Sequence, residues 1–307
     1  MMNFPKKLRK GDTVGIICPS SPIATERIGQ CVDAINRLGY NVKLADNLDV
    51  NYGGYMTGNG KARAKWVNDM FADPEVDAII CARGGEGGSR AMEYVDFELI
   101  KQNPKIFVGY SDVTCLHLGI TQNCGFVTFH GAMVSANFVD DFDAETEASF
   151  FGAVNADADY EYKNPKGFEL GVLKSGKATG QLTGGNLSLL SASMGTPYEV
   201  DTKDKIIFLE EVSEPVYNID KWMHQLRFAG KLQECKGILL GQFTDVVNKR
   251  CPEYDVNQCV MEALDGIDIP VMYNIQSGHE KPMTTLPLGA MCTMDTEDKT
   301  ITFQVTR

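Results

Sequence analysis

The chain has 307 residues, of which 43% are hydrophobic and 23% charged, and its formal net charge is −12. At roughly 150 residues per domain, this length predicts two domains with ample material for a hydrophobic core. The negative charge would repel phosphate backbones and anionic lipid, so we expect neither a nucleic-acid partner nor a membrane partner. The sequence shows no apolar run of the length needed for a membrane span or a signal peptide, which predicts a cytoplasmic protein.

The nine cysteines and four histidines follow no metal-binding or disulfide pattern. There is no CxxC pair and no HExxH motif, and most of the cysteines lie inside apolar runs such as VGIIC and AIICA. A free thiol in such a run behaves as a small core side chain. We therefore expect no metal, no other cofactor and no disulfide, and the odd number of cysteines fits a reducing compartment.

The first 137 residues alternate short apolar runs with helical patterns, and we assign residues 1–137 to one N-terminal α/β domain. Strands are predicted at residues 13–18, 41–45, 77–82, 105–109 and 126–131. Helices are predicted at residues 25–38 and 61–73, from residue 89, and between the last two strands. This alternation is typical of a mostly parallel sheet that helices cover on both faces.

Residues 138–177 change character, because they are acidic, rich in turn residues and only weakly periodic. We interpret them as an inter-domain crossover with a helix at residues 143–154. Residues 178–307 are predicted to form a C-terminal, mixed and β-rich α/β domain. Its strands are expected at 205–212, 237–243, 270–275, 292–296 and 300–305, and its helices near 186–194, 218–229 and 256–264. The active site is expected at the interface of the two domains.

The segment KIFVGYSDV places Ser111 between the end of a predicted strand and the start of a helix. In open α/β sheets, ligands bind at the carboxyl ends of the strands, so a serine at this junction would project into a binding crevice. Free N–H groups at the helix start, such as that of Asp112, could hold an oxyanion. The segment resembles a nucleophile elbow but lacks the second glycine of G-x-S-x-G. The alternative is that Ser111 only caps the helix.

A glycine-rich loop, ARGGEGGSR, follows the strand predicted at residues 77–82. It lacks both the GK[ST] ending of a P-loop and the GxGxxG pattern of a dinucleotide site, so phosphate chemistry is not indicated. The backbone N–H groups of Gly84 and Gly85 could instead donate a second hydrogen bond to an oxyanion. A tight turn without any role in catalysis is the alternative.

Two further stretches carry candidate catalytic side chains. IIFLEEV brings Glu210 and Glu211 to the end of an apolar strand, with their side chains on opposite faces. A carboxylate in such surroundings needs a partner, which could equally be a lysine or arginine in a structural ion pair. SGHEKP places His279 in a loop that is stiffened by proline, where it could act as a base or simply be solvated.

Seven stretches that occur in order along nearly the whole chain resemble the LD-carboxypeptidase family, the muramoyltetrapeptide carboxypeptidases of murein recycling. They are RGGEGGSR, NPKIFVGYSDVTCLHL, VTFHG, TGGNLSLL, FLEEVSEPVYNIDKWMHQL, ILLGQF and GHEKPMTTLPLG. The resemblance implies a serine peptidase in which Ser111 is the nucleophile, His279 the base and Glu210 the acid that orients the base. It places the oxyanion donors at the N–H of Asp112 and at a glycine N–H of the 84–85 pair.

The same resemblance implies a small peptide substrate, a murein tetrapeptide that is cut between the L-centre of diaminopimelate or lysine and a terminal D-alanine. It also implies a homodimer. Capture of the terminal carboxylate needs a cation or free N–H groups, and Arg83 or Arg90 could provide the cation, although each could equally form a structural ion pair. A histidine base with a pKa of about 6.5 predicts that activity falls below about pH 6.

Three positions depart from the family pattern. Glu86 stands where the family's RGGYG loop has tyrosine, Ala132 replaces the proline of HGP, and Lys221 occupies a position where arginine is common. None of the three belongs to the implied triad. Glu86 could line the pocket, so it leaves the substrate preference open.

Three other functions are compatible with parts of this pattern. A relative of the microcin-immunity proteins would use the same triad on a peptidyl- or aminoacyl-nucleotide, but Trp66 and Trp222 both fall in predicted helices and are not expected to stack on a base. A non-catalytic muropeptide-binding protein would need no general base. A dinucleotide-dependent enzyme would need the missing GxGxxG motif.

Overall fold

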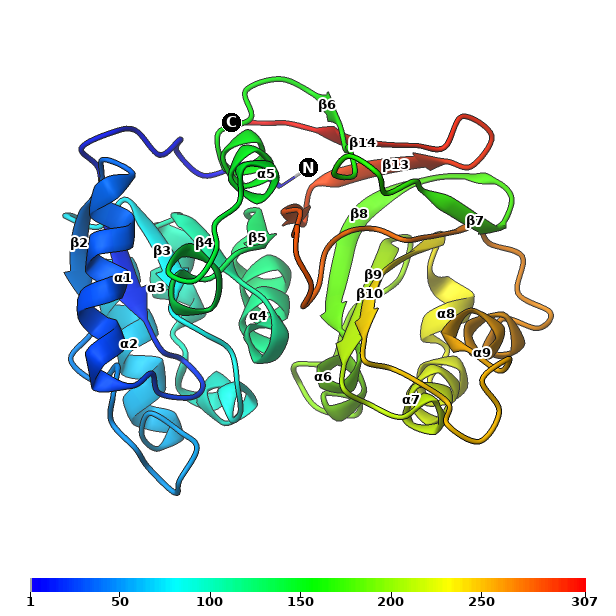
Figure 1. Cartoon of the computed structure of the whole chain (residues 1–307), viewed down its shortest axis with the longest axis horizontal. Coiled ribbons are helices and arrows are strands. Elements are labelled where there is room, and N and C mark those ends of the chain that lie inside the picture. The colour runs from blue at the N-terminus through cyan, green and yellow to red at the C-terminus, as the bar shows by residue number, and fades with distance from the viewer. Residues whose placement is uncertain (1) are drawn as a thin grey trace.

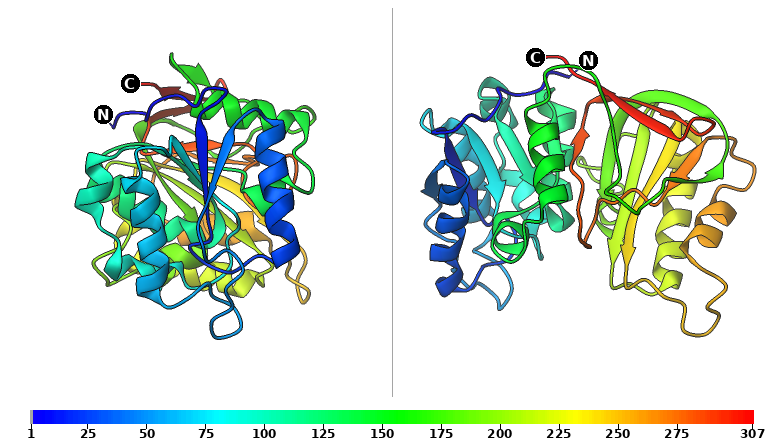
Figure 2. Two further views of the ribbon diagram at one scale, coloured as in Figure 1. Left: turned by 90° about the vertical axis from the view of Figure 1, so that its left-hand side faces the viewer. Right: turned by 45° about the horizontal axis from the view of Figure 1, so that its top comes forward.

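Two β-sheets organise the chain in the computed structural model, which describes residues 2–307. Figure 1 shows the two sheets side by side, each with its own helices, while helix α5 (Ala144–Val154) and both chain ends lie at the top between them. The right-hand view of Figure 2 shows the same separation into two lobes. A first α/β lobe and a second, β-rich lobe are therefore both present, as predicted.

The first sheet has six strands in the order β12-β5-β4-β3-β1-β2. They are β1 (Thr13–Ile17), β2 (Asn41–Leu44), β3 (Ala78–Cys81), β4 (Ile106–Gly109), β5 (Thr128–His130) and β12 (Leu286–Leu288). β1 to β5 pair in parallel, whereas β12 comes from the far end of the chain and pairs with β5 antiparallel. β3 and β4 are buried at every position, as parallel strands with two covered faces require. The late part of the chain thus adds an edge strand that the sequence analysis did not predict.

Helices cover both faces of this sheet, as the left-hand view of Figure 2 shows. They are α1 (Thr25–Arg37), α2 (Gly60–Ala72), α3 (Phe97–Gln102) and α4 (Thr114–Cys124), together with the 3₁₀ helices η1 (Gly88–Tyr94) and η2 (Ser111–Val113) and the π-helical turn η3 (Val134–Phe138). Asn59 caps α2 by accepting a hydrogen bond from the N–H of Ala62 at 2.9 Å. The short helix predicted from residue 89 is a 3₁₀ helix, and α3 was not predicted.

The second sheet has eight strands in the order β6-β14-β13-β8-β9-β10-β11-β7. They are β6 (Tyr160–Glu161), β7 (Gly171–Lys174), β8 (Lys177–Asn186), β9 (Ile206–Val212), β10 (Gly237–Thr244), β11 (Val271–Tyr273), β13 (Met291–Asp295) and β14 (Thr300–Gln304). β8 to β11 pair in parallel and the other strands pair antiparallel, so the sheet is mixed as predicted. The ten-residue β8 was not predicted; it pairs antiparallel with β13 on one side and parallel with β9 on the other, and so joins the antiparallel and the parallel parts of the sheet.

The helices of the second lobe pack against the parallel part of this sheet. They are α6 (Leu187–Ala192), α7 (Val216–Phe228), α8 (Lys231–Glu234) and α9 (Val256–Ala263). Figure 1 shows α7, α8 and α9 on the outer side of this lobe, where their apolar faces and those of β9 and β10 bury a second core. The domain limits at residues 137 and 178 stay a prediction, and β12 shows that the last part of the chain also completes the first sheet.

Within residues 2–307, no helix combines the length and the apolar character that a bilayer crossing requires. The same residues contain no group of three or more histidine, cysteine or acidic side chains placed to hold a metal ion. All nine cysteines are free thiols, and only Cys251 among them is partly exposed.

Candidate active site

Ser111 lies where the first sheet brings two loops together. β3 and β4 are parallel neighbours, so the loops that follow them, residues 82–87 and residue 110 onward, leave the sheet at the same edge. Gly84 approaches Ser111 so closely that a β-carbon on Gly84 would lie 2.9 Å from the Ser111 β-carbon, so only glycine fits there. Ser111 has a φ of +64°, a left-handed conformation that is strained for serine and is typical of functional sites.

Ser111 does not cap a helix, so that alternative is wrong. It is the first residue of η2, it follows the extended residue Tyr110, and neither η2 nor α4 has a side-chain cap. Within residues 2–307, the Ser111 hydroxyl makes no hydrogen bond. Its oxygen is therefore available to a ligand.

The glycine loop is packed against Ser21 from the loop after β1. Ser21 Oγ accepts a hydrogen bond from the N–H of Glu86 at 3.0 Å and donates one to the carbonyl of Tyr55 at 2.6 Å. Gly85 has a φ of +121°, and a β-carbon on it would stand 2.1 Å from Ser21 Oγ. No acceptor among the described residues is bonded to the N–H of Gly85. This N–H is therefore free to donate to a ligand.

The side chain of Asp112 joins the two loops. Its buried carboxylate accepts a hydrogen bond from the N–H of Gly88 at 2.6 Å. Burial raises the pKa of this carboxyl, and the hydrogen bond from the N–H of Gly88 only partly offsets the rise. The side chain of Asp112 therefore links the two loops. Its backbone N–H, in the first turn of η2, is the group that could hold an oxyanion.

Glu210 and His279 form a buried pair. Glu210 lies near the end of β9 with no exposed surface, and its Oε2 is 2.8 Å from His279 Nδ1. No lysine or arginine within the described residues forms an ion pair with Glu210, and the His279 side chain is only 16% exposed. The alternatives of a lysine or arginine ion pair and of a solvated histidine are therefore wrong. A bond from Nδ1–H to the carboxylate leaves Nε2 as the basic nitrogen of the neutral ring.

Glu211 points to the other face of β9, as strand alternation predicts, and its hydrogen bonds are satisfied there. Its carboxylate accepts hydrogen bonds from Asn186 Nδ2 at 2.8 Å, from the N–H of Ser188 at 2.8 Å and from the N–H of Val212 at 3.0 Å. Burial raises its pKa, and these hydrogen bonds partly offset the rise. The structure therefore separates the two carboxylates, since Glu210 meets the histidine and Glu211 fixes the start of α6.

Gln242 holds the loop that carries His279. Its backbone N–H donates to the carbonyl of Ser277 at 3.0 Å, and its side-chain oxygen accepts a hydrogen bond from the N–H of Glu280 at 2.9 Å. Gly278, with a φ of +152°, would place a β-carbon 2.8 Å from Gln242 Cβ, so a side chain there would disturb the contact. Gln242 is not among the site residues predicted from the sequence, although a polar residue inside the apolar run GILLGQF was an available signal.

Helix α5 holds the same loop from the other side. The hydroxyl of Thr146 accepts a hydrogen bond from the N–H of Met283 at 3.0 Å. The hydroxyl of Ser149 accepts one from the N–H of Thr285 at 3.0 Å. The crossover helix therefore ties the His279 loop to the first lobe, a role that no local sequence pattern indicated.

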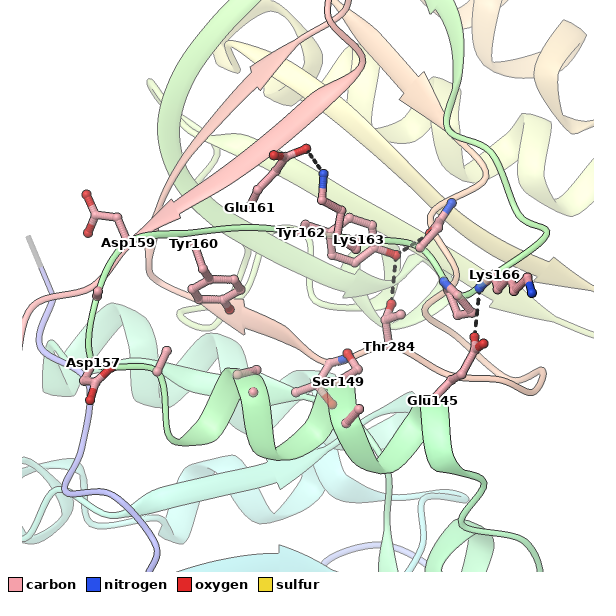
Figure 3. Close-up of a pocket in the computed structure, with 18 residues that line it drawn as sticks. Glu145, Ser149, Asp157, Asp159, Tyr160, Glu161, Tyr162, Lys163, Lys166 and Thr284 are labelled. Atoms are coloured by element: carbon pink, nitrogen blue, oxygen red, sulfur yellow. Dashed lines mark hydrogen bonds and ion pairs between the residues drawn. The ribbon is translucent and has the colours of Figure 1, made fainter.

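A hollow of about 660 Å³ separates α5 from the crossover segment at residues 156–166, as Figure 3 shows. Tyr162 lies on the crossover side, where its hydroxyl is bonded to Asn164 at 2.6 Å and to Thr284 at 2.9 Å. None of the predicted site residues lines this hollow. The hollow lies beside residues that hold the His279 loop, such as Ser149 and Thr284, and Ser111 does not line it.

A cavity of about 410 Å³ brings the predicted side chains together at the boundary of the two lobes. Its lining includes Arg83, Gly84, Gly85, Ser111 and His279. The His279 ring packs edge-on against Tyr110, the residue before the serine, with 4.9 Å between ring centroids. No hydrogen bond joins Ser111 and His279 within the described residues. In serine hydrolases this link is often loose until substrate is bound.

Opposing effects set the pKa of His279. Burial lowers it, because the charged imidazolium loses its water. The hydrogen bond to Glu210 and the negative charges of Glu210 and Glu211 raise it, and together they place the pKa above its ordinary value of 6.5. If His279 is the base, as the sequence predicts, the fall in activity expected below about pH 6 should occur at higher pH.

A groove of about 670 Å³ lies beyond the glycine loop, across the boundary between the lobes. Glu86, Arg90 and Asp112 line it from the first lobe, and Trp222 lines it from α7 of the second. Arg83, by contrast, faces the cavity that contains the serine. Trp222 is half-buried and offers an aromatic surface to the groove, contrary to the expectation from sequence.

Comparison with known proteins identifies the family. Residues 14–131 match the LD-carboxypeptidase N-terminal domain, and residues 179–294 match the LD-carboxypeptidase C-terminal domain. The chain is 40% identical over 298 residues to a probable murein peptide carboxypeptidase of Bacillus subtilis (strain 168), with 96% of this chain and 92% of that protein covered. The chain belongs to the LD-carboxypeptidase family. It is an enzyme of the carboxypeptidase type, and the resemblance seen in its sequence is confirmed.

Two further comparisons agree with this assignment. The chain is 29% identical over 331 residues to the microcin C7 self-immunity protein MccF of Escherichia coli, with 96% of this chain and 93% of that protein covered. The crystal structure of a muramoyltetrapeptide carboxypeptidase from Oxalobacter formigenes superposes with a TM-score of 0.84 at 25% identity, covering 96% of this chain and 99% of that chain. The predicted fold class of this LD-carboxypeptidase family member is thereby confirmed.

Proposed function

We propose that this family member is a serine L,D-carboxypeptidase that releases the terminal D-alanine from a murein tetrapeptide. The observation that carries the proposal is the buried Glu210–His279 pair, 2.8 Å apart, beside the cavity that also contains Ser111. A histidine that is oriented by a carboxylate near an unbonded serine hydroxyl is the arrangement that acyl transfer needs. The 40% identity to a probable murein peptide carboxypeptidase supports the choice of substrate.

In the proposed reaction, His279 takes the proton of the Ser111 hydroxyl as its oxygen attacks the carbonyl carbon of the scissile amide. Glu210 holds the required tautomer and stabilises the imidazolium that forms. The N–H groups of Gly85 and Asp112 donate to the oxyanion of the tetrahedral intermediate. His279 then gives its proton to the amine of the departing D-alanine. Water, deprotonated by the same histidine, hydrolyses the remaining acyl-serine ester.

Arg83 is the cation that we assign to the terminal carboxylate. It lines the cavity with the serine and forms no ion pair with an acidic side chain within residues 2–307. Its guanidinium makes only long hydrogen bonds, to the carbonyls of Gly84 at 3.3 Å and Pro22 at 3.4 Å. A small cavity with an unpaired arginine suits a single amino acid whose carboxylate is free.

We also propose that the enzyme works in the cytoplasm, in peptidoglycan recycling, as a homodimer without nucleic-acid or membrane partners. The nine free thiols support a reducing compartment. The name of the Bacillus subtilis relative supports murein fragments as substrates. The homodimer rests on the family resemblance, and sedimentation of the purified protein tests it.

Mass spectrometry of a muropeptide mixture tests the proposed function. We expect incubation with the enzyme to convert tetrapeptides into tripeptides and to release D-alanine. Ser175→Ala, which alters an exposed serine that lines neither the cavity nor the groove, is expected to behave as the wild type. Tetrapeptides that stay intact in the presence of folded enzyme would refute the proposal.

We expect kcat/KM for D-alanine release to fall on the acidic side with an apparent pKa above 6.5. The base must be neutral, and Glu210 raises the pKa of His279, so protonation removes the base at a higher pH than in free imidazole. Initial rates between about pH 5 and pH 9 measure this profile. A kcat/KM that stays constant from about pH 8 to pH 5 would rule out His279 as the base.

A second candidate function is hydrolysis of a peptidyl- or aminoacyl-nucleotide. Trp222 on the groove wall favours it, because nucleotide bases stack on aromatic side chains. Glu86 on the same groove disfavours it, since a carboxylate repels the nucleotide's phosphate. Parallel assays with a murein tetrapeptide and a peptidyl-nucleotide separate the two functions, and we expect the tetrapeptide to be the better substrate.

A further inference from the structure

We propose that the groove beyond the glycine loop holds the side chain of the residue whose carbonyl is cut, and that Glu86 and Arg90 select a side chain ending in an ammonium next to a carboxylate. Diaminopimelate ends in this way, whereas lysine ends in an ammonium alone. The inference rests on the proposed function and names the substrate class of that site.

The position of His279 decides which part of the substrate occupies which opening. A histidine base in acyl transfer gives its proton to the leaving amine, so the leaving group must lie on the histidine's side of the nucleophile. His279 and Ser111 line the cavity of about 410 Å³, and His279 does not line the groove. The departing D-alanine therefore occupies the cavity, and the acyl part of the peptide extends into the groove.

The cavity and the groove differ in size and charge, and the difference matches a substrate whose D-alanine lies in the cavity and whose acyl part lies in the groove. The cavity of about 410 Å³ offers Arg83 to the single carboxylate of the leaving D-alanine. The groove of about 670 Å³ has room for a longer side chain and offers two exposed groups of opposite charge, Glu86 and Arg90, while the carboxylate of Asp112 is buried and bonded to Gly88. A leaving group with one charge and an acyl residue with a zwitterionic end match these two openings.

The groove adjoins the cavity that contains Ser111, because neighbouring residues of the chain line the two openings. Asp112, the residue after the nucleophile, lines the groove directly. Glu86 lies between Gly84, which touches Ser111, and Gly88, whose N–H is bonded to Asp112 at 2.6 Å. Both ends of this short loop thus lie beside Ser111 and Asp112, and the proposal places the side chain of Glu86 against the acyl residue.

Glu86 and Arg90 are exposed on the groove wall, and neither forms an ion pair within residues 2–307. Among the described residues, the Arg90 guanidinium bonds only to the sulfur of Met56, at 3.5 Å. Two opposite charges on one wall that are not paired with each other can each take a partner from the ligand. Glu86 suits the ammonium, and the planar guanidinium of Arg90 suits the carboxylate.

A lysine side chain would satisfy only half of this arrangement. Its ammonium can pair with Glu86, but Arg90 gains no partner and faces a like charge instead. Because ion pairs at exposed positions have modest energies, we expect a preference of about tenfold in kcat/KM for the zwitterionic side chain.

D-alanine release from two tetrapeptides that differ only at the third residue, diaminopimelate or lysine, tests the inference. We expect the wild type to favour the diaminopimelate peptide by about tenfold and Arg90→Ala to bring the ratio close to one. Glu86→Gln should lower kcat/KM for both peptides. Glu93→Gln and Arg37→Ala remove the same charges from exposed positions that line neither opening, so they serve as matched controls with wild-type ratios.

The outcomes separate this inference from the proposed function. A wild-type preference that persists in Arg90→Ala, or a wild type without preference, would overturn the assignment of the carboxylate to Arg90. Unchanged rates on both peptides in Glu86→Gln would overturn the assignment of the ammonium to Glu86. If the wild type releases D-alanine from neither peptide, the proposed function itself fails and the inference falls with it.

Discussion

Replacing Ser111 with alanine is expected to lower kcat/KM for D-alanine release by roughly 10⁴ to 10⁶, the loss that follows removal of a triad nucleophile. Without the hydroxyl no acyl-enzyme can form, and only binding and the oxyanion donors remain to assist attack by water. The hydroxyl makes no hydrogen bond within residues 2–307, so its removal should leave the folded structure intact. Release of D-alanine by purified variant and wild type, with melting temperatures of both, measures the effect.

The control for this variant is Ser175→Ala, the same chemical change at an exposed site away from both openings. It is expected to retain wild-type kinetics. A Ser111→Ala enzyme that keeps more than about a tenth of the wild-type rate would show that another group makes the attack.

Glu210→Gln is expected to lower kcat by about 10³ to 10⁴, whereas Glu211→Gln should lower it by less than about tenfold. Glu210 is the carboxylate that accepts the hydrogen bond from His279 Nδ1 at 2.8 Å, and an amide in its place would no longer stabilise the imidazolium. Glu211 is bonded to Asn186 and Ser188 instead. The pair thus offers a matched comparison of adjacent carboxylates on one strand.

The pH profile provides a second measurement on the same two variants. Glu210 is the principal group that raises the pKa of His279, so the acidic limb of kcat/KM should move to lower pH in Glu210→Gln. Glu211 contributes less, and its variant should show a smaller shift. Greater damage from Glu211→Gln at unchanged melting temperature would mean that the orienting carboxylate is Glu211.

Much of the first sheet was predictable because its strands have a local signal. β1, β3 and β4 are short runs of β-branched and other apolar residues that end near glycine or polar residues, and their burial on both faces requires this composition. The glycine loop and the junction at Ser111 follow from the same pattern, since each comes directly after such a strand. These predictions needed no knowledge of distant contacts.

β8 escaped prediction because its glycines serve contacts with other segments. The run KATGQLTGGN has no apolar alternation. In the structure, a β-carbon on Gly184 would lie 2.1 Å from the carbonyl oxygen of Phe208, and one on Gly185 would lie 2.6 Å from Thr114 Oγ1. Close contacts with β9 and α4 require glycine at these two positions. Because glycine is rare inside strands, the local sequence predicts a loop.

β12 escaped for a related reason. Leu286–Leu288 contains a proline and only three residues, which by themselves indicate a loop. It becomes a strand because it pairs with β5 at the edge of the first sheet. The hydroxyls of Thr146 and Ser149 on α5 accept hydrogen bonds from the N–H groups of Met283 and Thr285, and so hold the residues just before it.

The sequence by itself determined which chemical groups the site has and the local backbone on which each stands: a serine at a strand-to-helix junction, two glycines beside it and a carboxylate at the end of an apolar strand. Only the tertiary structure decided that Glu210 rather than Glu211 meets His279, and that His279 lines the same cavity as Ser111. The physical reason is that local sequence patterns and tertiary packing act over different distances along the chain. Periodicity and turn propensity act over a few residues, whereas the meeting of side chains from distant segments depends on how two sheets pack.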